Sequence, residues 1–121
     1  MTNSNLETTP LLSILCITYN HEKYISKAIK SFLEQETSFD FEIVIGEDCS
    51  TDNTLEVILE FQKNHSKIIK IIKSEKNIGV TKNFRRTLAA CRGKYIALCE
   101  GDDYWDDPKK IQTQVSFLES N

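Results

Sequence analysis

The chain has 121 residues, of which 40% are hydrophobic and 27% are charged, and its formal net charge is −3. This length and composition predict one globular domain that can bury a core. The negative net charge argues against a nucleic-acid groove, because binding to phosphates needs a concentrated basic surface.

The first half of the chain alternates between apolar runs and amphipathic stretches. Residues 1–10 are polar, and we expect a disordered tail there. The apolar run over residues 11–17 is typical of a strand that is buried on both faces, and a second strand is expected over 41–46. Apolar residues at helical spacing over 25–33 predict a helix between the two strands.

The polar loop over residues 47–53 leads into a second helix. Ser50 and Thr51 are the candidate caps of that helix. Its apolar face is marked by Leu55, Ile58 and Leu59. A third strand is expected over 68–72, and the sequence Asn-Ile-Gly at 77–79 predicts a turn after it.

The last part of the chain predicts two more helices around a fourth strand over residues 95–99. Gly93 is expected to end the third helix as its C′ residue. The apolar residues of that helix are Phe84, Leu88 and Cys91. Pro108 is expected to open the last helix, since proline is tolerated in a first turn. The apolar face of the last helix is formed by Ile111, Val115 and Leu118.

Strands and helices that alternate in this way predict an α/β fold. We expect a three-layer open, mainly parallel sheet with helices on both faces and right-handed crossovers. Such sheets bind ligands outside the carboxyl ends of their strands. Three polar clusters follow predicted strands, at residues 18–20, 47–48 and 100–103. The sequence therefore predicts that these clusters meet along one edge.

The acidic cluster after the fourth strand places three carboxylates within four residues: Glu100, Asp102 and Asp103. Like charges packed beside a buried strand are costly unless a cation neutralises them. Hard divalent cations favour carboxylate oxygens, and their other ligands are often waters and phosphates of a bound substrate. The alternative is a solvated acidic loop that caps the last helix, a role that we also expect for Asp106 and Asp107.

Five segments, in order and at matching spacing, resemble the inverting family 2 glycosyltransferases. The opening strand reads L-S-I-L-C-I-T-Y-N over residues 12–20, and E-D-C-S-T-D over 47–52 is similar to that family's Asp-Asp-Gly-Ser-x-Asp loop. Residues 77–80 and 91–96 match its central block. E-G-D-D-Y-W over 100–105 stands in the place of its Asp-x-Asp metal motif.

The resemblance implies a GT-A type fold with a Rossmann-like nucleotide-binding half over residues 11–121. It also implies a nucleoside-diphosphate-sugar donor, commonly a UDP-sugar, with Mn²⁺ or Mg²⁺ as cofactor. The acceptor would be a glycan or a lipid-linked glycan in the synthesis of cell-surface polysaccharide. One alternative is a module that binds a nucleotide without chemistry. A nucleotidyltransferase is a weaker alternative, because no Gly-rich, basic loop follows the first strand.

Carried over by position, the resemblance assigns roles to individual side chains. Tyr19 would lie against the nucleobase, and Asp48 would accept a hydrogen bond from a base N–H. Asp102 would be the principal metal ligand, with Asp103 beside it. The implied nucleotide-binding set is Thr18, Tyr19, Asn20, Asp48 and Glu100.

The sequence departs from the family pattern at several of these positions. Glu47 and Glu100 stand where the family commonly has Asp, and Cys49 stands where it commonly has Gly. The usual diphosphate-facing Arg is absent from its position, where Arg85 or Arg86 is the candidate replacement. His21 is assigned to a helix start, and Trp105 is expected to anchor the last helix in the core.

An inverting transfer also needs a general base that deprotonates the acceptor. In the family this carboxylate follows the metal motif, and nothing in the sequence matches it. We therefore expect the catalytic base beyond Asn121, in a chain that is truncated at its C-terminus and that transfers no sugar by itself.

Composition also bears on the compartment. The four cysteines show neither metal-ligand spacing nor a Cys-x-x-Cys motif, which indicates reduced thiols. Residues 1–10 lack the apolar core of a signal peptide, and no apolar stretch approaches the roughly 20 residues that span a bilayer. We expect a cytoplasmic protein, and peripheral association with the inner face of the membrane, through segments outside this sequence, stays open.

Overall fold

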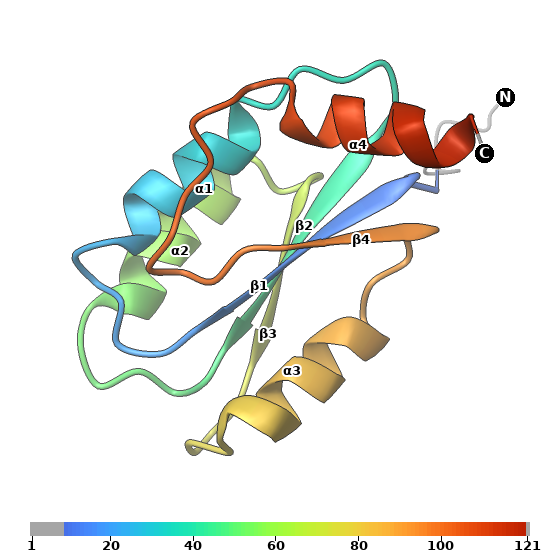
Figure 1. Ribbon diagram of the computed structural model, residues 1–121. Coiled ribbons are helices and arrows are strands. Elements are labelled where there is room, and N and C mark those ends of the chain that lie inside the picture. The colour runs from blue at the N-terminus through green and yellow to red at the C-terminus, as the bar shows by residue number, and fades with distance from the viewer. Residues whose placement is uncertain (1–8, 121) are drawn as a thin grey trace, which may run out of the picture.

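The computed structural model describes residues 9–120, so residues 1–8 of the predicted tail lie outside the described residues. The elements in chain order are β1 (Leu12–Thr18), α1 (Ile25–Leu33), β2 (Phe41–Glu47), α2 (Thr54–Asn64), β3 (Ile69–Lys73), α3 (Val80–Ala89), β4 (Tyr95–Leu98) and α4 (Lys110–Glu119). The strands pair in parallel in the order β3-β2-β1-β4. Figure 1 shows three layers, with α3 on one face of the sheet and α1, α2 and α4 on the other. The predicted α/β fold class is confirmed.

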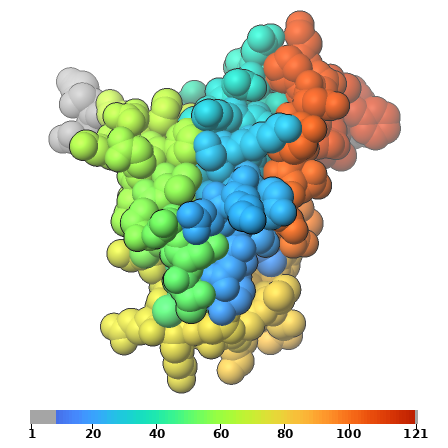
Figure 2. Space-filling model, turned by 90° about the vertical axis from the view of Figure 1, so that its left-hand side faces the viewer, coloured from blue at the N-terminus to red at the C-terminus, as the bar shows by residue number. Residues whose placement is uncertain are grey.

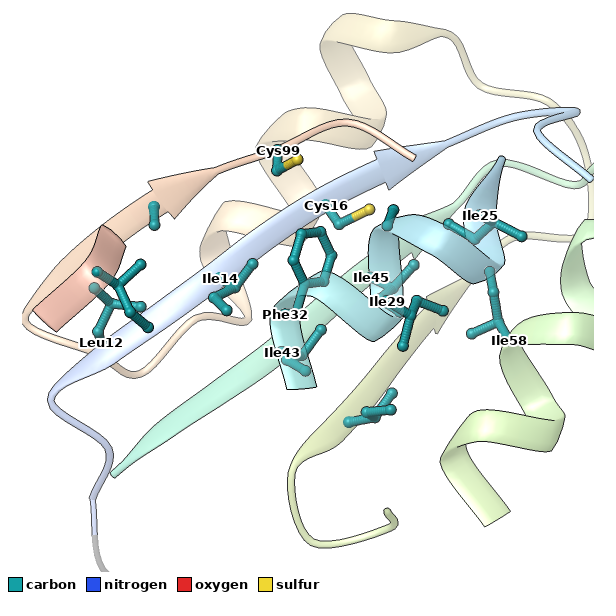
Figure 3. Close-up of a cluster of buried hydrophobic side chains, with 14 of the residues drawn as sticks. Leu12, Ile14, Cys16, Ile25, Ile29, Phe32, Ile43, Ile45, Ile58 and Cys99 are labelled. Atoms are coloured by element: carbon teal, nitrogen blue, oxygen red, sulfur yellow. The ribbon is translucent and has the colours of Figure 1, made fainter. Parts of the chain in front are cut away.

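The main core lies between the sheet and α1, as Figure 3 shows. Alternate β1 residues, Leu12, Ile14 and Cys16, face this side, since side chains on a strand alternate between its faces. On α1 the buried residues include Ile29 and Phe32, which recur at helical spacing. Burying each side chain of this size contributes roughly 1.5–3 kcal/mol. This core holds β1 in the middle of the sheet and so sets the direction in which its carboxyl end points.

The loop after β4 is fastened to the same core by Trp105. The Trp105 ring lies 5.1 Å from the Phe32 ring, centre to centre, and the Trp105 N–H of the backbone donates to Ser31 Oγ. Trp105 thus packs against the core, as expected, and the contacts that hold it come from α1. It fixes the far end of the segment that carries the acidic cluster.

On the opposite face, α3 packs through polar side chains. Its buried residues are Asn83 and Thr87, whereas Leu88 is 40% exposed. Helix and strand approach closely at Gly46, where a Cβ would lie 2.0 Å from Thr87 Oγ1, and Asn83 Nδ2 donates to the Gly46 carbonyl. Of the apolar residues that mark this helix in the sequence, Phe84 and Cys91 are half-buried and Leu88 is exposed. Because Gly46 has no side chain, α3 packs close to β2 through the small polar residues Asn83 and Thr87.

The predicted role of Gly93 is wrong. The α3 helix ends at Ala89, and its C-cap residue is Ala90. Gly93 instead lies against β1, where its N–H donates to Ser13 Oγ and an added Cβ would come within 2.5 Å of the Ser13 nitrogen. Glycine is needed there because two backbones meet.

Two helix starts also differ from the prediction. Asp52 Oδ1, rather than Ser50 or Thr51, accepts from the Thr54 N–H at the start of α2. Pro108 precedes α4 in a turn, and the helix begins at Lys110. Asp107 Oδ1 accepts from the Lys109 N–H in that turn, as expected of a capping carboxylate.

Two further expectations can be compared with the structure. All four cysteines are free. Among residues 9–120, no helix has the length and apolarity that a membrane crossing requires.

Candidate functional site

The carboxyl ends of all four strands point to one edge of the sheet, because the strands are parallel. Asp48 N donates to the Thr18 carbonyl and Gly101 N to the Ile17 carbonyl, so the segments after β2 and β4 run beside the end of β1. Figure 2 looks onto this edge, with the blue segment after β1 between the green segment after β2 and the orange segment after β4. The three polar clusters predicted to converge do so.

The loops after β1 and β2 are joined through side chains. Asn20 N donates to Ser50 Oγ at 2.9 Å, and Thr51 N donates to Asn20 Oδ1 at 2.8 Å. Ser50 and Thr51 therefore bind the neighbouring loop instead of capping α2. Asn20 has a positive φ of 55°, and Cys49 one of 61°, so both loops make a left-handed turn at the edge.

Glu47 organises the loop that follows it. Its side chain is buried, and its carboxylate accepts from the backbone N–H groups of Cys49 and Ser50. An acceptor in this place satisfies donors that the left-handed turn at Cys49 would otherwise leave unpaired. Glu47 thus contributes to the loop and not to the surface of the site.

Asp48 connects the site to the loop before α3. It is 3% exposed, and its two carboxylate oxygens accept from Ile78 N at 2.8 Å and from Gly79 N at 3.0 Å. Asn77 Nδ2 also donates to the Asp48 carbonyl. Asn77 and Gly79, predicted as turn residues, are thus held in place by Asp48.

Of the two candidate arginines, Arg86 is turned into the protein. Its guanidinium donates to the Glu47 carbonyl at 2.9 Å and to Asn83 Oδ1 at 2.8 Å. It therefore ties α3 to the end of β2 and does not extend over the edge. Arg85 is exposed on the same helix.

Two hollows lie side by side at this edge. The first has a volume of about 250 Å³ and is lined by Ile17, Thr18, Tyr19, His21, Asp48, Val80, Asn83 and Glu100. The second, of about 470 Å³, is lined by Leu15, Ile17, Phe84, Leu98, Cys99, Glu100, Asp102 and Asp103. Ile17 and Glu100 border both, so the two hollows adjoin at these residues, and together they have a size that suits a small-molecule ligand.

The acidic cluster approaches the first loop through His21. Thr18 Oγ1 lies 2.9 Å from His21 Nδ1, and Asp102 Oδ2 lies 3.8 Å from His21 Nε2. Gly101 permits this contact, since a Cβ there would lie 2.5 Å from Thr18 Oγ1 and 2.9 Å from His21 Nδ1. The side chain of Asp102 is 51% exposed.

The negative charge of this cluster affects the neighbouring thiols. Burial, together with the negative charges of Asp103 and Asp102, raises the pKa of Cys99 to about 12. Burial likewise raises the pKa of Cys16, with Cys99 and the acidic residues adding to the effect. Both thiols are therefore protonated and unreactive at neutral pH, since the thiolate is the nucleophile.

The carboxylates of the acidic cluster supply only part of the ligand set that a divalent ion requires. Among residues 9–120, no three His, Cys, Asp or Glu side chains converge as a metal site. Mg²⁺, however, is commonly held by one or two carboxylates together with waters and substrate phosphates. Asp102 and Asp103 both line an open hollow, so neither carboxylate is closed off from a ligand there.

Most of the side chains assigned from the sequence border the two hollows. Thr18, Tyr19, Asp48 and Glu100 line the first, and Asp102 and Asp103 line the second with Glu100. Asn20 lines neither hollow, because its amide oxygen is bound to the loop after β2.

The sequence analysis did not assign several lining residues. The missed residues are Leu15, Ile17, His21, Val80, Asn83, Phe84, Leu98 and Cys99. Most are apolar, and apolar side chains in strands and helices carry no local signal that separates a lining residue from a core residue. For His21, its place directly after Asn20 was the available signal.

Comparisons with known proteins agree with this geometry. The family model described as "Glycosyl transferase family 2" matches residues 13–121. An uncharacterized protein of Mycobacterium tuberculosis is 45% identical over 108 residues, which cover 89% of this chain and 31% of that protein. The chain thus spans less than two thirds of the length of such relatives.

Two solved structures show the same fold. The crystal structure of Staphylococcus aureus TarS 1-349 in complex with UDP superposes with a TM-score of 0.77 at 32% identity, covering 90% of this chain and 32% of that chain. A mannosyltransferase from Pyrobaculum calidifontis, in complex with GDP-Man and Mn²⁺, superposes with a TM-score of 0.80 at 18% identity, covering 92% of this chain and 33% of that chain.

Proposed function

The chain belongs to glycosyl transferase family 2, and from this premise we propose that residues 11–121 are the nucleotide-sugar-binding part of a metal-dependent inverting glycosyltransferase. The donor is a UDP-sugar, and the acceptor is a glycan or lipid-linked glycan of cell-surface polysaccharide. One observation carries the proposal: the two hollows at the carboxyl edge of the sheet meet at Glu100. This suits a ligand with a base at one end and a charged diphosphate and sugar at the other.

In this proposal the nucleoside occupies the first hollow. Tyr19 is 40% exposed and borders it, so its ring is available to stack on a base. Asp48 lines the same hollow while it holds the loop before α3. A carboxylate has about four acceptor positions, so Asp48 can hold the loop and accept a base N–H together. UDP as the nucleotide is supported by the TarS structure, whose ligand it is.

The diphosphate and sugar occupy the second hollow. Glu100 stands where the two hollows meet, close to the expected position of the ribose. Asp102 and Asp103 face the second hollow and are the proposed ligands of Mn²⁺ or Mg²⁺. Such an ion, once bound, neutralises charge that develops on the departing diphosphate. The protein's own contribution is to hold two carboxylates at the end of a short, rigid strand.

The test is calorimetric titration of the chain with UDP, with and without Mn²⁺. We expect weak binding of UDP that Mn²⁺ strengthens, and little binding of Mn²⁺ alone, because the ion needs the diphosphate to complete its ligands. A folded chain that shows no metal-dependent binding of UDP would overturn the proposal. A preference for GDP would overturn the choice of base alone.

Matched variants assign the two hollows. Tyr19→Ala should weaken the binding of UDP by about 1–3 kcal/mol with or without metal, because stacking between a base and an aromatic ring usually contributes this much. Tyr24→Ala is its control, since Tyr24 is exposed at the start of α1 and borders neither hollow. Asp102→Ala should remove the gain from Mn²⁺, whereas Asp106→Ala, the same charge change outside both hollows, should retain it.

A further inference from the structure

We propose that His21 is a positioning residue that holds Asp102 toward the second hollow through its Nε2–H group. The inference rests on the proposed role of Asp102 as a metal ligand. His21 lies on the loop after β1, and Asp102 lies after β4, 81 positions along the chain from His21. The contact between them exists only because β1 and β4 are neighbours in the sheet.

The imidazole ring of His21 is held from the side of β1. Thr18, the last residue of β1, is buried, and its Oγ1 lies 2.9 Å from His21 Nδ1. The backbone of His21 is fixed as well, because its N–H donates to Thr54 Oγ1 at 2.9 Å. The absence of a side chain at Gly101 leaves room for the ring against the backbone that precedes Asp102.

The partners of the ring determine its tautomer. The carboxylate of Asp102 only accepts hydrogen bonds when ionised, so a favourable contact requires a proton on Nε2. Nδ1 of the neutral ring then carries a lone pair and accepts from the Thr18 hydroxyl. This tautomer leaves no lone pair on Nε2, so His21 orients a metal ligand and is not itself a ligand.

The distance of 3.8 Å between Nε2 and Asp102 Oδ2 exceeds that of a hydrogen bond. The Asp102 side chain is 51% exposed and the His21 side chain 20% exposed, so the carboxylate has more freedom than the ring. In the proposal, rotation of the more exposed Asp102 carboxylate brings it within hydrogen-bond range of Nε2 while the residue lines the second hollow. Partners of this kind, which orient a ligand without binding the ion, typically change metal affinity by about 10–100-fold when removed.

Two variants separate the two nitrogen atoms of the ring. In His21→Asn, the side-chain amide reaches the position of Nδ1 and can pair with Thr18, but it is too short to reach Asp102. In His21→Gln, the amide nitrogen reaches the position of Nε2 and can donate to Asp102. The matched control is His65→Asn, because His65 is exposed at the end of α2 and borders neither hollow.

The readout is the affinity of Mn²⁺ in the presence of saturating UDP, measured from the paramagnetic resonance signal of free Mn²⁺. We expect His21→Asn to lower this affinity about tenfold or more and His21→Gln to restore most of it. UDP affinity without metal is measured for both variants as well, because His21 borders the first hollow, and the inference concerns only the additional affinity that Mn²⁺ confers. In the background of Asp102→Ala, His21→Asn should have no further effect.

Normal Mn²⁺ affinity in a folded His21→Asn variant would overturn the inference while leaving the proposed function in place. Equal losses in the Asn and Gln variants would also overturn it, because they would indicate a structural role of the ring. Absence of metal-dependent UDP binding in the wild-type chain would instead remove the proposed function, and the inference with it. Thermal unfolding of each variant shows whether a loss of Mn²⁺ affinity is due to misfolding. If His21→Asn is misfolded, the Mn²⁺ affinity of the folded His21→Gln variant tests the inference, and a loss as large as that expected for His21→Asn would overturn it.

Discussion

At the scale of single residues, the site depends on two left-handed backbone positions. Asn20 has a φ of 55° and Cys49 a φ of 61°. Asn tolerates this region because its side chain can bond locally, and here Asn20 Oδ1 accepts from Thr51 N. Cys has no such compensation, and its conformation is imposed by Glu47, which accepts from the Cys49 N–H. Glycine would adopt this conformation without strain, in agreement with the Gly that the family resemblance implies in the place of Cys49.

Cys49→Gly is therefore expected to stabilise the chain. A non-glycine residue costs roughly 1–2 kcal/mol in the left-handed region, and the greater freedom of glycine in the unfolded chain returns about half of that. The expected gain is about 0.5–1 kcal/mol in the free energy of unfolding, measured by urea denaturation. Cys49→Ala is the control, because it removes the thiol and keeps the Cβ. An equal gain in both variants would show that strain at Cys49 is not the cause.

At the scale of elements, Glu42 joins three strands and a connection. It is 3% exposed on β2, and its Oε2 accepts from Ser13 Oγ of β1 at 2.6 Å and from Arg92 N at 2.7 Å. Lys70 Nζ of β3 lies 3.5 Å from Oε1. Burial acts to raise the pKa of Glu42, but the bonds from Ser13 and Arg92 and the charge of Lys70 outweigh it, so the pKa is lowered.

This environment predicts a pH-dependent contribution to stability. A carboxyl with a lowered pKa stabilises the folded chain above its unfolded value, near 4.5, and the contribution is lost as the pH falls through the lower folded value. Glu42→Gln should therefore cost about 1.5–3 kcal/mol at neutral pH, the usual worth of hydrogen bonds to a charged group.

The measurement is urea unfolding of both chains over a series of pH values. The difference between wild type and Glu42→Gln should narrow as the pH falls below 4.5, because the unfolded chain takes up a proton there that the folded carboxyl binds only at a lower pH. Glu60→Gln, at an exposed position of α2, should show almost no difference at any pH. A Glu42→Gln deficit that stays constant down to the lowest pH would contradict the assignment.

At the scale of the whole molecule, Asp107 and Glu119, which follow the acidic cluster, make their contacts outside the two hollows. Asp107 Oδ1 accepts from Lys109 N in the turn before α4. Glu119 pairs with the Tyr95 hydroxyl and with Lys94, beside the start of β4, while Glu100 follows the end of that strand. A general base must lie within about 2.6–3.2 Å of the attacking hydroxyl, or one water away.

We therefore expect that this 121-residue chain binds donor but transfers no sugar by itself. The experiment incubates it with UDP-sugars, Mn²⁺ and a panel of glycan and lipid acceptors, with products followed by mass spectrometry. Slow hydrolysis of the donor by water is compatible with the expectation. Repeated transfer that Asp102→Ala abolishes would mean that these residues include the base.

Much of the architecture could be predicted because its signals are local. Periodicity separates strands from helices within a few residues, and alternation of the two requires parallel strands whose carboxyl ends share an edge. The convergence of residues 18–20, 47–48 and 100–103 follows from that alone. The metal and nucleotide roles of Asp102, Tyr19 and their neighbours were carried by the family resemblance and stay predictions.

The remaining features were decided by contacts between residues that are distant in the sequence. Gly93 is a typical helix-end residue in the sequence, but in the structure it packs against the backbone of Ser13, 80 positions earlier. The sequence predicts ligand binding for Asn20 and helix capping for Ser50. In the structure, each of these residues forms a hydrogen bond to the loop that carries the other. His21 meets Asp102 only where two neighbouring strands end. Hydrophobic periodicity determines which elements form, whereas such polar contacts depend on the strand order, which places residues side by side regardless of their separation along the chain.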